Sequence, residues 1–69
     1  MENLSKKIRE LRKEQGLTQK ELAEKLLTAQ PTVAYWEQNK RYPDLFSLRK
    51  ICNFFDVSAD YLLGRVEEY

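Results

Sequence analysis

The sequence lacks several residues on which most enzyme and metal sites depend. It contains no histidine, a single cysteine, Cys52, and only two glycines in 69 residues. Histidine is the side chain most often used for acid–base catalysis near neutral pH and for binding transition metals. One cysteine allows neither an internal disulfide nor a zinc cluster, and two isolated glycines form no phosphate-binding loop. We therefore expect no enzyme, no metal, no cofactor and no small-molecule ligand, with Cys52 acting as a small buried hydrophobe.

Long apolar runs are also missing. No stretch approaches the roughly 18 consecutive apolar residues that span a bilayer, and the first residues lack the apolar segment of a secretory signal. The sequence thus predicts no membrane association, and the lone cysteine agrees with the reducing cytoplasm. Hydrophobic residues make up 42% of the chain and charged residues 33%, as in a globular domain. We expect a single small domain over residues 1–69.

Charge is unevenly distributed, although the net charge is only +1. Residues 1–41 hold nine Lys and Arg against six Asp and Glu, whereas residues 42–69 hold three against five. The first part of the chain can therefore present a basic surface to a polyanion. Scattered lysines are also common on any solvated helix, so charge alone does not identify the partner.

Apolar residues recur with helical spacing along almost the whole chain, and β-branched residues are sparse. This pattern predicts an all-α fold of five helices. We expect the helices at residues 4–15, 18–26, 30–38, 45–55 and 59–63. Residues 65–69 are expected to fray or to pack on a partner.

Capping residues mark both ends of these expected helices. Thr18, with Glu21 three residues later, forms a capping box. Asp44 and Ser58 are the expected N-caps of the last two helices. The residues expected to end helices, mostly in the left-handed conformation, are Gly16, Asn39, Asp56 and Gly64.

The second and third helices have the dimensions of a helix-turn-helix, spanning Thr18 to Gln38. Ala23 supplies the small side chain that a close helix crossing needs. The apolar side chains expected between the two helices are Leu22, Leu26, Val33 and Trp36. The opposite face of the third helix is then exposed, and in a DNA-binding protein that face enters the major groove.

Three stretches of the chain match the pattern of a known family in collinear order. They are residues 17–26 (LTQKELAEKL), 33–43 (VAYWEQNKRYP) and 55–63 (FDVSADYLL). These stretches resemble the second helix, the recognition helix with its following loop, and the last helix corner of lambda-repressor-like (Cro/XRE-type) helix-turn-helix regulators. The resemblance covers nearly the whole chain and implies a compact five-helix domain that binds DNA as a homodimer.

The resemblance also assigns roles to individual side chains. Gln19, at the start of the second helix, is implied to hydrogen-bond a phosphate. Gln30 falls where family members contact a base, and a glutamine can bind adenine N6 and N7 together. Thr32 and Tyr35 match exposed positions of the recognition helix that meet bases or backbone. The implied phosphate contacts in the following loop are Asn39, Lys40 and Arg41.

An ion pair between Arg12 and Glu37, tying the first helix to the third, is implied as well. The chain departs from the family pattern in the turn, where Leu27 stands in place of the usual glycine. Leucine is disfavoured if the backbone is left-handed there.

The start of the recognition helix departs from the family pattern too. Ala29 replaces the usual serine or threonine cap, so Thr28 or Gln30 is expected to cap the helix instead. Pro31 is tolerated only in the first helical turn, and it biases Gln30 away from helical geometry.

The leading interpretation is a sequence-specific transcriptional regulator, and specifically a repressor, that reads the major groove of double-stranded DNA with residues 30–38. We expect it to bind a near-palindromic operator as a homodimer. The candidate dimer contacts are Phe46, Phe54, Tyr61 and Val66. Two alternatives remain open: an antitoxin-like protein-interaction subunit with the same fold, and a controller protein of a restriction or toxin system.

Overall fold

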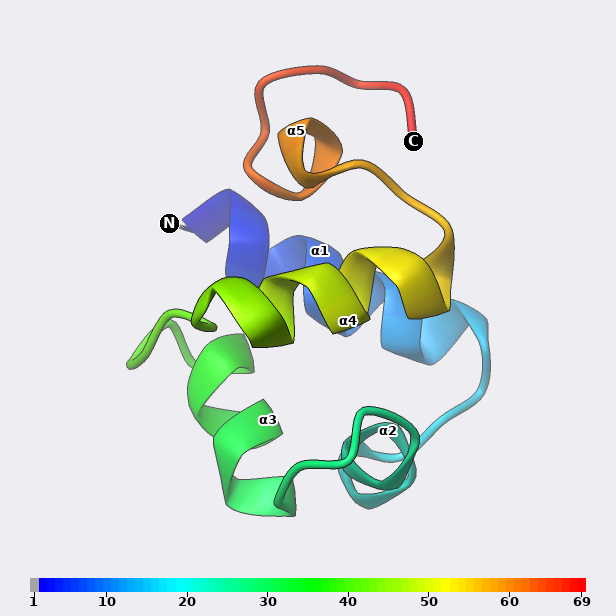
Figure 1. Cartoon of the computed structure of the whole chain (residues 1–69), viewed down its shortest axis with the longest axis vertical. Helices are drawn as coiled ribbons and strands as arrows, with labels where there is room; N and C mark the ends of the chain where they lie inside the picture. The colour runs from blue at the N-terminus through cyan, green and yellow to red at the C-terminus, as the bar shows by residue number, and fades with distance from the viewer. Residues whose placement is uncertain (1) are drawn as a thin grey trace.

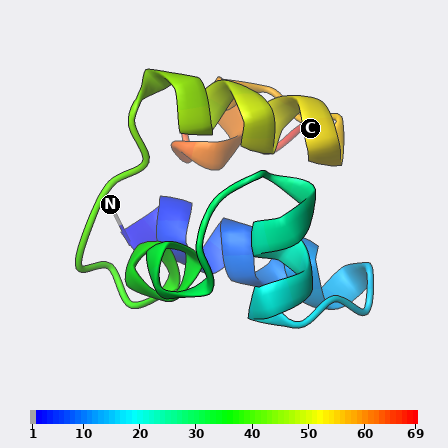
Figure 2. The same ribbon diagram turned by 60° about the horizontal axis from the view of Figure 1, so that its bottom comes forward.

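The computed structural model describes residues 2–69, with side chains from residue 3, as five helices around one core. The helices are α1 (Glu2–Glu14), α2 (Gln19–Lys25), α3 (Gln30–Glu37), α4 (Leu45–Phe55) and α5 (Ala59–Leu62). Helix α2 packs on α3, α1 contacts both α3 and α5, and α4 contacts α5. Figure 1 shows α2 and α3 at one end of the molecule and α5 at the other, and Figure 2 shows α4 and α5 on one side with α1, α2 and α3 on the other. The predicted all-α fold is confirmed, and each helix boundary agrees within two residues.

Every helix contributes to the core. The side chains with no accessible surface come one from each helix, in chain order: Ile8, Leu22, Val33, Ile51 and Leu62. Burying each such side chain stabilises the fold by about 1.5–3 kcal/mol, so no helix can detach without a substantial loss. Ala23 is only 2% exposed and lets α2 and α3 approach closely, as its small size predicts.

Hydrogen-bonding side chains cap the starts of three helices. The Thr18 hydroxyl accepts from the Glu21 amide at 3.0 Å, and the Glu21 carboxylate accepts from the Thr18 amide at 2.8 Å. The hydrogen bond from the Thr18 amide lowers the pKa of the Glu21 carboxyl. The Asp44 and Ser58 side chains cap α4 and α5 by accepting from the Ser47 and Tyr61 amides at 2.7 and 3.0 Å. These three caps are the predicted ones.

The start of α3 is different. Ala29 is the N-cap residue, no side chain caps the helix, and Pro31 lies in the first turn. The expectation that Thr28 or Gln30 would take over the cap is therefore wrong. The Gln30 amide is instead used in a contact with α2.

In the described residues, 2–69, each of the five helices is followed by a residue in the left-handed conformation. These residues are Gly16, Leu27, Asn39, Asp56 and Gly64, with φ between 56° and 79°. After α2, the amides of Leu27 and Thr28 donate to the carbonyls of Glu24 and Ala23 at 3.2 and 2.9 Å, the Schellman pattern. Leu27 is thus left-handed at the position where the family that this chain resembles has glycine.

Residues 65–69 return to α5 and do not fray. The Ser58 amide donates to the Tyr69 carbonyl at 2.7 Å, and the Tyr61 and Tyr69 rings meet edge to face at 4.7 Å. At Gly64, a Cβ atom would collide with the side chain of Asn3 on α1. The expectation that these residues fray is corrected, because they pack on their own chain.

Three further features bear on function. Cys52 is half-buried against the core, and this burial raises the pKa of its thiol, which disfavours the reactive thiolate. Within residues 2–69, no helix is long and apolar enough to cross a bilayer. In the same part of the chain, no group of three or more acidic, cysteine or histidine side chains is arranged to hold a metal ion.

The left-handed backbone at Leu27 is strained, and relieving this strain should raise the stability of the fold. The Leu27 side chain is 84% exposed and adds little packing, while its φ is 57°. A left-handed backbone costs a residue with a Cβ atom roughly 1–2 kcal/mol. We expect Leu27→Gly to raise the free energy of unfolding in urea by about 1 kcal/mol, after the entropy cost of the added glycine.

Leu27→Ala is the matched control, because alanine keeps the Cβ atom and therefore the strain. It should leave the stability almost unchanged. Equal stability of the glycine and alanine variants would contradict the assignment of strain to this turn.

Candidate nucleic-acid interface

Helix α3 buries one side and exposes the other. Val33 and Trp36 are 0% and 3% exposed and hold the helix against the core. The side chains that remain exposed along α3 and its C-cap are Gln30, Pro31, Tyr35 and Gln38, with Thr32 and Ala34 half-buried. Because α2 and α3 form one end of the molecule (Figure 1), this face is free to meet a large partner.

A largely buried ion pair joins α1 to the end of α3. The Nε and Nη2 groups of Arg12 donate to the two carboxylate oxygens of Glu37 at 2.7 and 3.0 Å. The third guanidinium nitrogen donates to the Leu17 carbonyl at 2.7 Å. The side chains of Arg12 and Glu37 are only 12% and 4% exposed. This forked geometry is specific to arginine and holds α3 in a defined position on α1.

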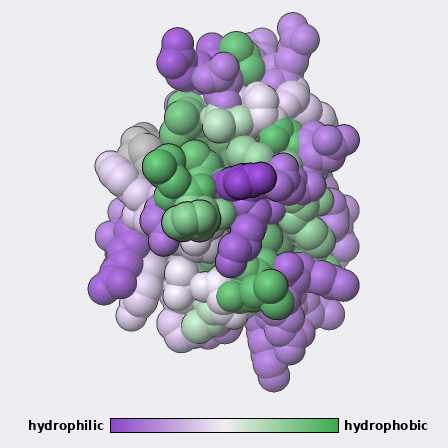
Figure 3. Space-filling model, in the orientation of Figure 1, coloured by the Kyte–Doolittle hydropathy of each residue, from purple (hydrophilic) through white to green (hydrophobic). Residues whose placement is uncertain are grey.

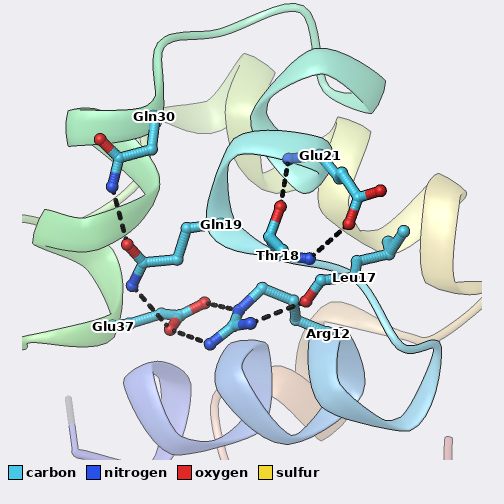
Figure 4. A network of polar contacts seen from close by, with 7 residues as sticks. All are labelled: Arg12, Leu17, Thr18, Gln19, Glu21, Gln30 and Glu37. Carbon is cyan, nitrogen blue, oxygen red and sulfur yellow. Dashed lines mark hydrogen bonds and ion pairs between the residues drawn. The ribbon is translucent and has the colours of Figure 1, made fainter.

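The ion pair continues into a chain of amide contacts that reaches the start of α3 (Figure 4). Gln19 Nε2 donates to Glu37 Oε1 at 3.2 Å, and Gln30 Nε2 donates to Gln19 Oε1 at 2.8 Å. A carboxylate only accepts hydrogen bonds, so Glu37 takes the NH₂ group of Gln19. The carbonyl oxygen of Gln19 must then face Gln30, and both amides are held in one orientation.

Gln30 keeps the groups that bind a base. One of its N–H bonds is used on Gln19, while its carbonyl oxygen and second N–H have no partner among the described residues. Together these two groups form the pair that binds adenine N6 and N7. The sequence suggested that Gln19 and Gln30 contact DNA separately, and their separation of eleven positions in the chain gave no signal that they touch.

A hollow in the surface lies beside these glutamines, between α2 and the start of α3. It is lined by Arg12, Thr18, Gln19, Lys20, Ala23, Glu24, Thr28 and Gln30. The amide groups and the Lys20 ammonium are donors of the kind that bind phosphate oxygens.

The loop after α3 folds back on the helix that precedes it. Asn39, with φ 60°, reverses the chain. The amides of Lys40 and Arg41 then both donate to the Tyr35 carbonyl, at 2.9 and 3.4 Å. The Arg41 guanidinium carbon lies over the Tyr35 ring, 5.4 Å from its centroid. All three loop side chains are exposed, which leaves their polar groups accessible beside α3.

The chain is similar to known helix-turn-helix proteins. A helix-turn-helix family model matches residues 8–62. The HTH-type transcriptional regulator ImmR of Bacillus subtilis (strain 168) is 43% identical over 65 residues, which cover 94% of this chain and 51% of ImmR. The HTH-type transcriptional activator BcrR of Enterococcus faecalis is 40% identical over 63 residues, 91% of this chain and 31% of BcrR.

An uncharacterized HTH-type transcriptional regulator of Bacillus subtilis (strain 168), YqaE, is 41% identical over 59 residues. The match covers 86% of this chain and 51% of YqaE. The chain thus spans about half of the length of ImmR and YqaE and less of BcrR.

The ion pair gives a prediction for stability. Arg12→Met leaves the buried Glu37 carboxylate without its main partner, so we expect the free energy of unfolding in urea to fall by about 3 kcal/mol. The double variant Arg12→Met/Glu37→Met removes both charges and should recover most of that loss.

The matched control is Arg65→Met, because Arg65 faces Asp60 at 3.8 Å in a pair whose side chains are 75% and 60% exposed. Such exposed pairs contribute little, and no measurable change is expected. A double variant as unstable as Arg12→Met would mean that the loss comes from packing and not from the unpaired charge.

Proposed function

The chain belongs to the helix-turn-helix family, of the Cro/C1 or XRE-like type, and from that premise we propose that it binds double-stranded DNA sequence-specifically and regulates transcription. The family consists of DNA-binding regulators and not of enzymes. The observation that carries the proposal is the oriented amide of Gln30, held by Gln19 at 2.8 Å on the exposed side of α3. The regulator names of ImmR and BcrR support it.

In the proposed mechanism, α3 enters the major groove and Gln30 binds a base edge, adenine being the base that its free groups fit. Thr32 and Tyr35 lie further along the same helix. The second N–H of Gln19 contacts a phosphate. The proposed phosphate contacts after the helix are Asn39, Lys40 and Arg41. Because the Gln30 side chain is ordered before binding, little rotamer entropy is lost when it meets the base.

We further propose that two copies bind a near-palindromic operator, with half-sites about 34 Å apart. A single domain of this size buries too little surface for strong specificity. Leu45 and Phe46, at the start of α4, are 82% and 78% exposed, and Figure 3 shows hydrophobic surface over this half of α4. Leu45 comes four residues after Arg41, the last residue of the proposed DNA-contacting loop, so copies on adjacent half-sites can meet there.

The four dimer candidates from the sequence differ in exposure. Phe54 packs edge to face on Phe55 at 5.0 Å, and Tyr61 packs on Tyr69 at 4.7 Å. Val66 is 43% exposed. Phe46, at 78% exposed, is the most exposed of the four and is therefore the candidate that we retain for the dimer contact.

We propose repression in the cytoplasm as the mode of regulation, since occupying an operator that overlaps a promoter blocks transcription without a second partner. The relative BcrR is named an activator. A reporter gene behind the selected operator distinguishes the two, because transcription falls with a repressor and rises with an activator.

Selection of bound sequences from a random DNA pool, followed by titrations over a range of salt, tests DNA binding directly. Affinity should fall steeply with salt because phosphate contacts release counterions. Lys40→Ala should weaken all sequences about equally and reduce the salt slope by about 0.9. Gln30→Ala should reduce the preference at one base pair by about 1–3 kcal/mol.

Lys6→Ala is the control for Lys40→Ala, because Lys6 is an exposed lysine of α1 outside the candidate interface. Binding that is absent or independent of salt would reject the DNA proposal and favour a protein-interaction subunit. An unchanged preferred sequence in Gln30→Ala would reject the assigned role of Gln30.

Sedimentation over a range of protein concentrations tests the dimer. We expect Phe46→Ser to weaken self-association and to remove cooperative binding to paired half-sites, because it takes an apolar side chain out of the contact. Leu63→Ser, an apolar residue 41% exposed after α5, is the control and should leave both unchanged. A wild-type protein that stays monomeric on its operator would contradict the dimer.

A further inference from the structure

Tyr35 is the one aromatic side chain on α3 outside the core, at 40% exposed. Its backbone carbonyl and its ring both contact the loop after α3. The carbonyl accepts from the amides of Lys40 and Arg41 at 2.9 and 3.4 Å, and the ring carries the Arg41 guanidinium at 5.4 Å. The left-handed Asn39 makes this return possible. Tyr35 and Arg41 thus form a unit in the absence of DNA.

The cation–π contact with the Tyr35 ring orders Arg41 without using its hydrogen-bond donors. An exposed arginine samples many rotamers, and ordering its side chain opposes binding. The cation–π attraction to the ring uses no hydrogen bond, and the five side-chain N–H donors of Arg41 have no hydrogen-bond partner among the described residues. Those donors stay available for the forked contact that arginine makes with phosphate oxygens.

We propose that Tyr35 is a positioning residue that acts through Arg41. Its ring holds the guanidinium beside α3, ready to bind a DNA phosphate, and its hydroxyl reads no base. This inference rests on the proposed DNA binding and refines the role that the sequence suggested for Tyr35, a direct contact to a base or the backbone.

Paired substitutions on the selected operator separate the ring from the hydroxyl. Arg41→Ala should lower the affinity by about tenfold or more and reduce the salt slope by about 0.9. Tyr35→Leu keeps an apolar side chain without the π system, and should lower the affinity by about two- to fivefold. Tyr35→Phe keeps the ring and should match the wild type in affinity, salt slope and preferred sequence.

The double variant Tyr35→Leu/Arg41→Ala should bind no more weakly than Arg41→Ala, because Tyr35 has no role left when Arg41 is gone. In the free protein, the ring-current shift of the Arg41 side-chain protons should persist in Tyr35→Phe and disappear in Tyr35→Leu. This second measurement needs no DNA, and circular dichroism confirms that each variant is folded.

Additive losses in the double variant would overturn the inference, as would weaker binding or an altered base preference in Tyr35→Phe. In either case the wild type still binds DNA, so the proposed function stands. A wild type without salt-dependent DNA binding would overturn the proposed function and this inference with it.

Discussion

The carboxylate of Glu37 is the acceptor on which the candidate interface depends. Its side chain is 4% exposed, and it accepts hydrogen bonds from Arg12 on α1 and Gln19 on α2. A buried carboxylate is costly unless its partners remain in place. The three helices are therefore held in one arrangement by polar contacts as well as by the core. The orientation of Gln30 is the last step of that chain, because Gln30 donates to the oxygen of Gln19 that Glu37 leaves free.

Two side chains with candidate DNA-binding roles are ordered on the exposed surface before any partner is present. Gln30 is held by Gln19, and Arg41 is held by Tyr35. For a domain of this size, the area available for an interface is small. Affinity then depends strongly on how little conformational freedom is lost on binding. Such preorganisation lowers the entropy cost of each contact that Gln30 and Arg41 make on binding. It gives a functional reason for these polar side chains to pair with their neighbours on an exposed surface.

The turn between α2 and α3 shows how packing overrides local preference. Leu27 takes a left-handed conformation that glycine adopts more readily. The amides of Leu27 and Thr28 must reach carbonyls of α2 for the Schellman pattern to close. Lys50 of α4 also donates to the Leu26 carbonyl at 3.2 Å, which fastens this turn to the other half of the fold. The close approach of α2 and α3 is maintained at the expense of backbone strain at one residue.

The sequence by itself determined the elements of this protein. Helix boundaries, the caps at Thr18 and Ser58 and the buried stripe follow from spacing and from contacts between residues three or four apart, which are local. The resemblance named the positions of the candidate site, but not which side chains touch. The contact between Gln19 and Gln30, the missing cap at Ala29 and the return of residues 65–69 to α5 were decided only by the tertiary structure. They depend on the angles at which helices pack, and those angles are set by the whole core and leave no periodic signal in the sequence.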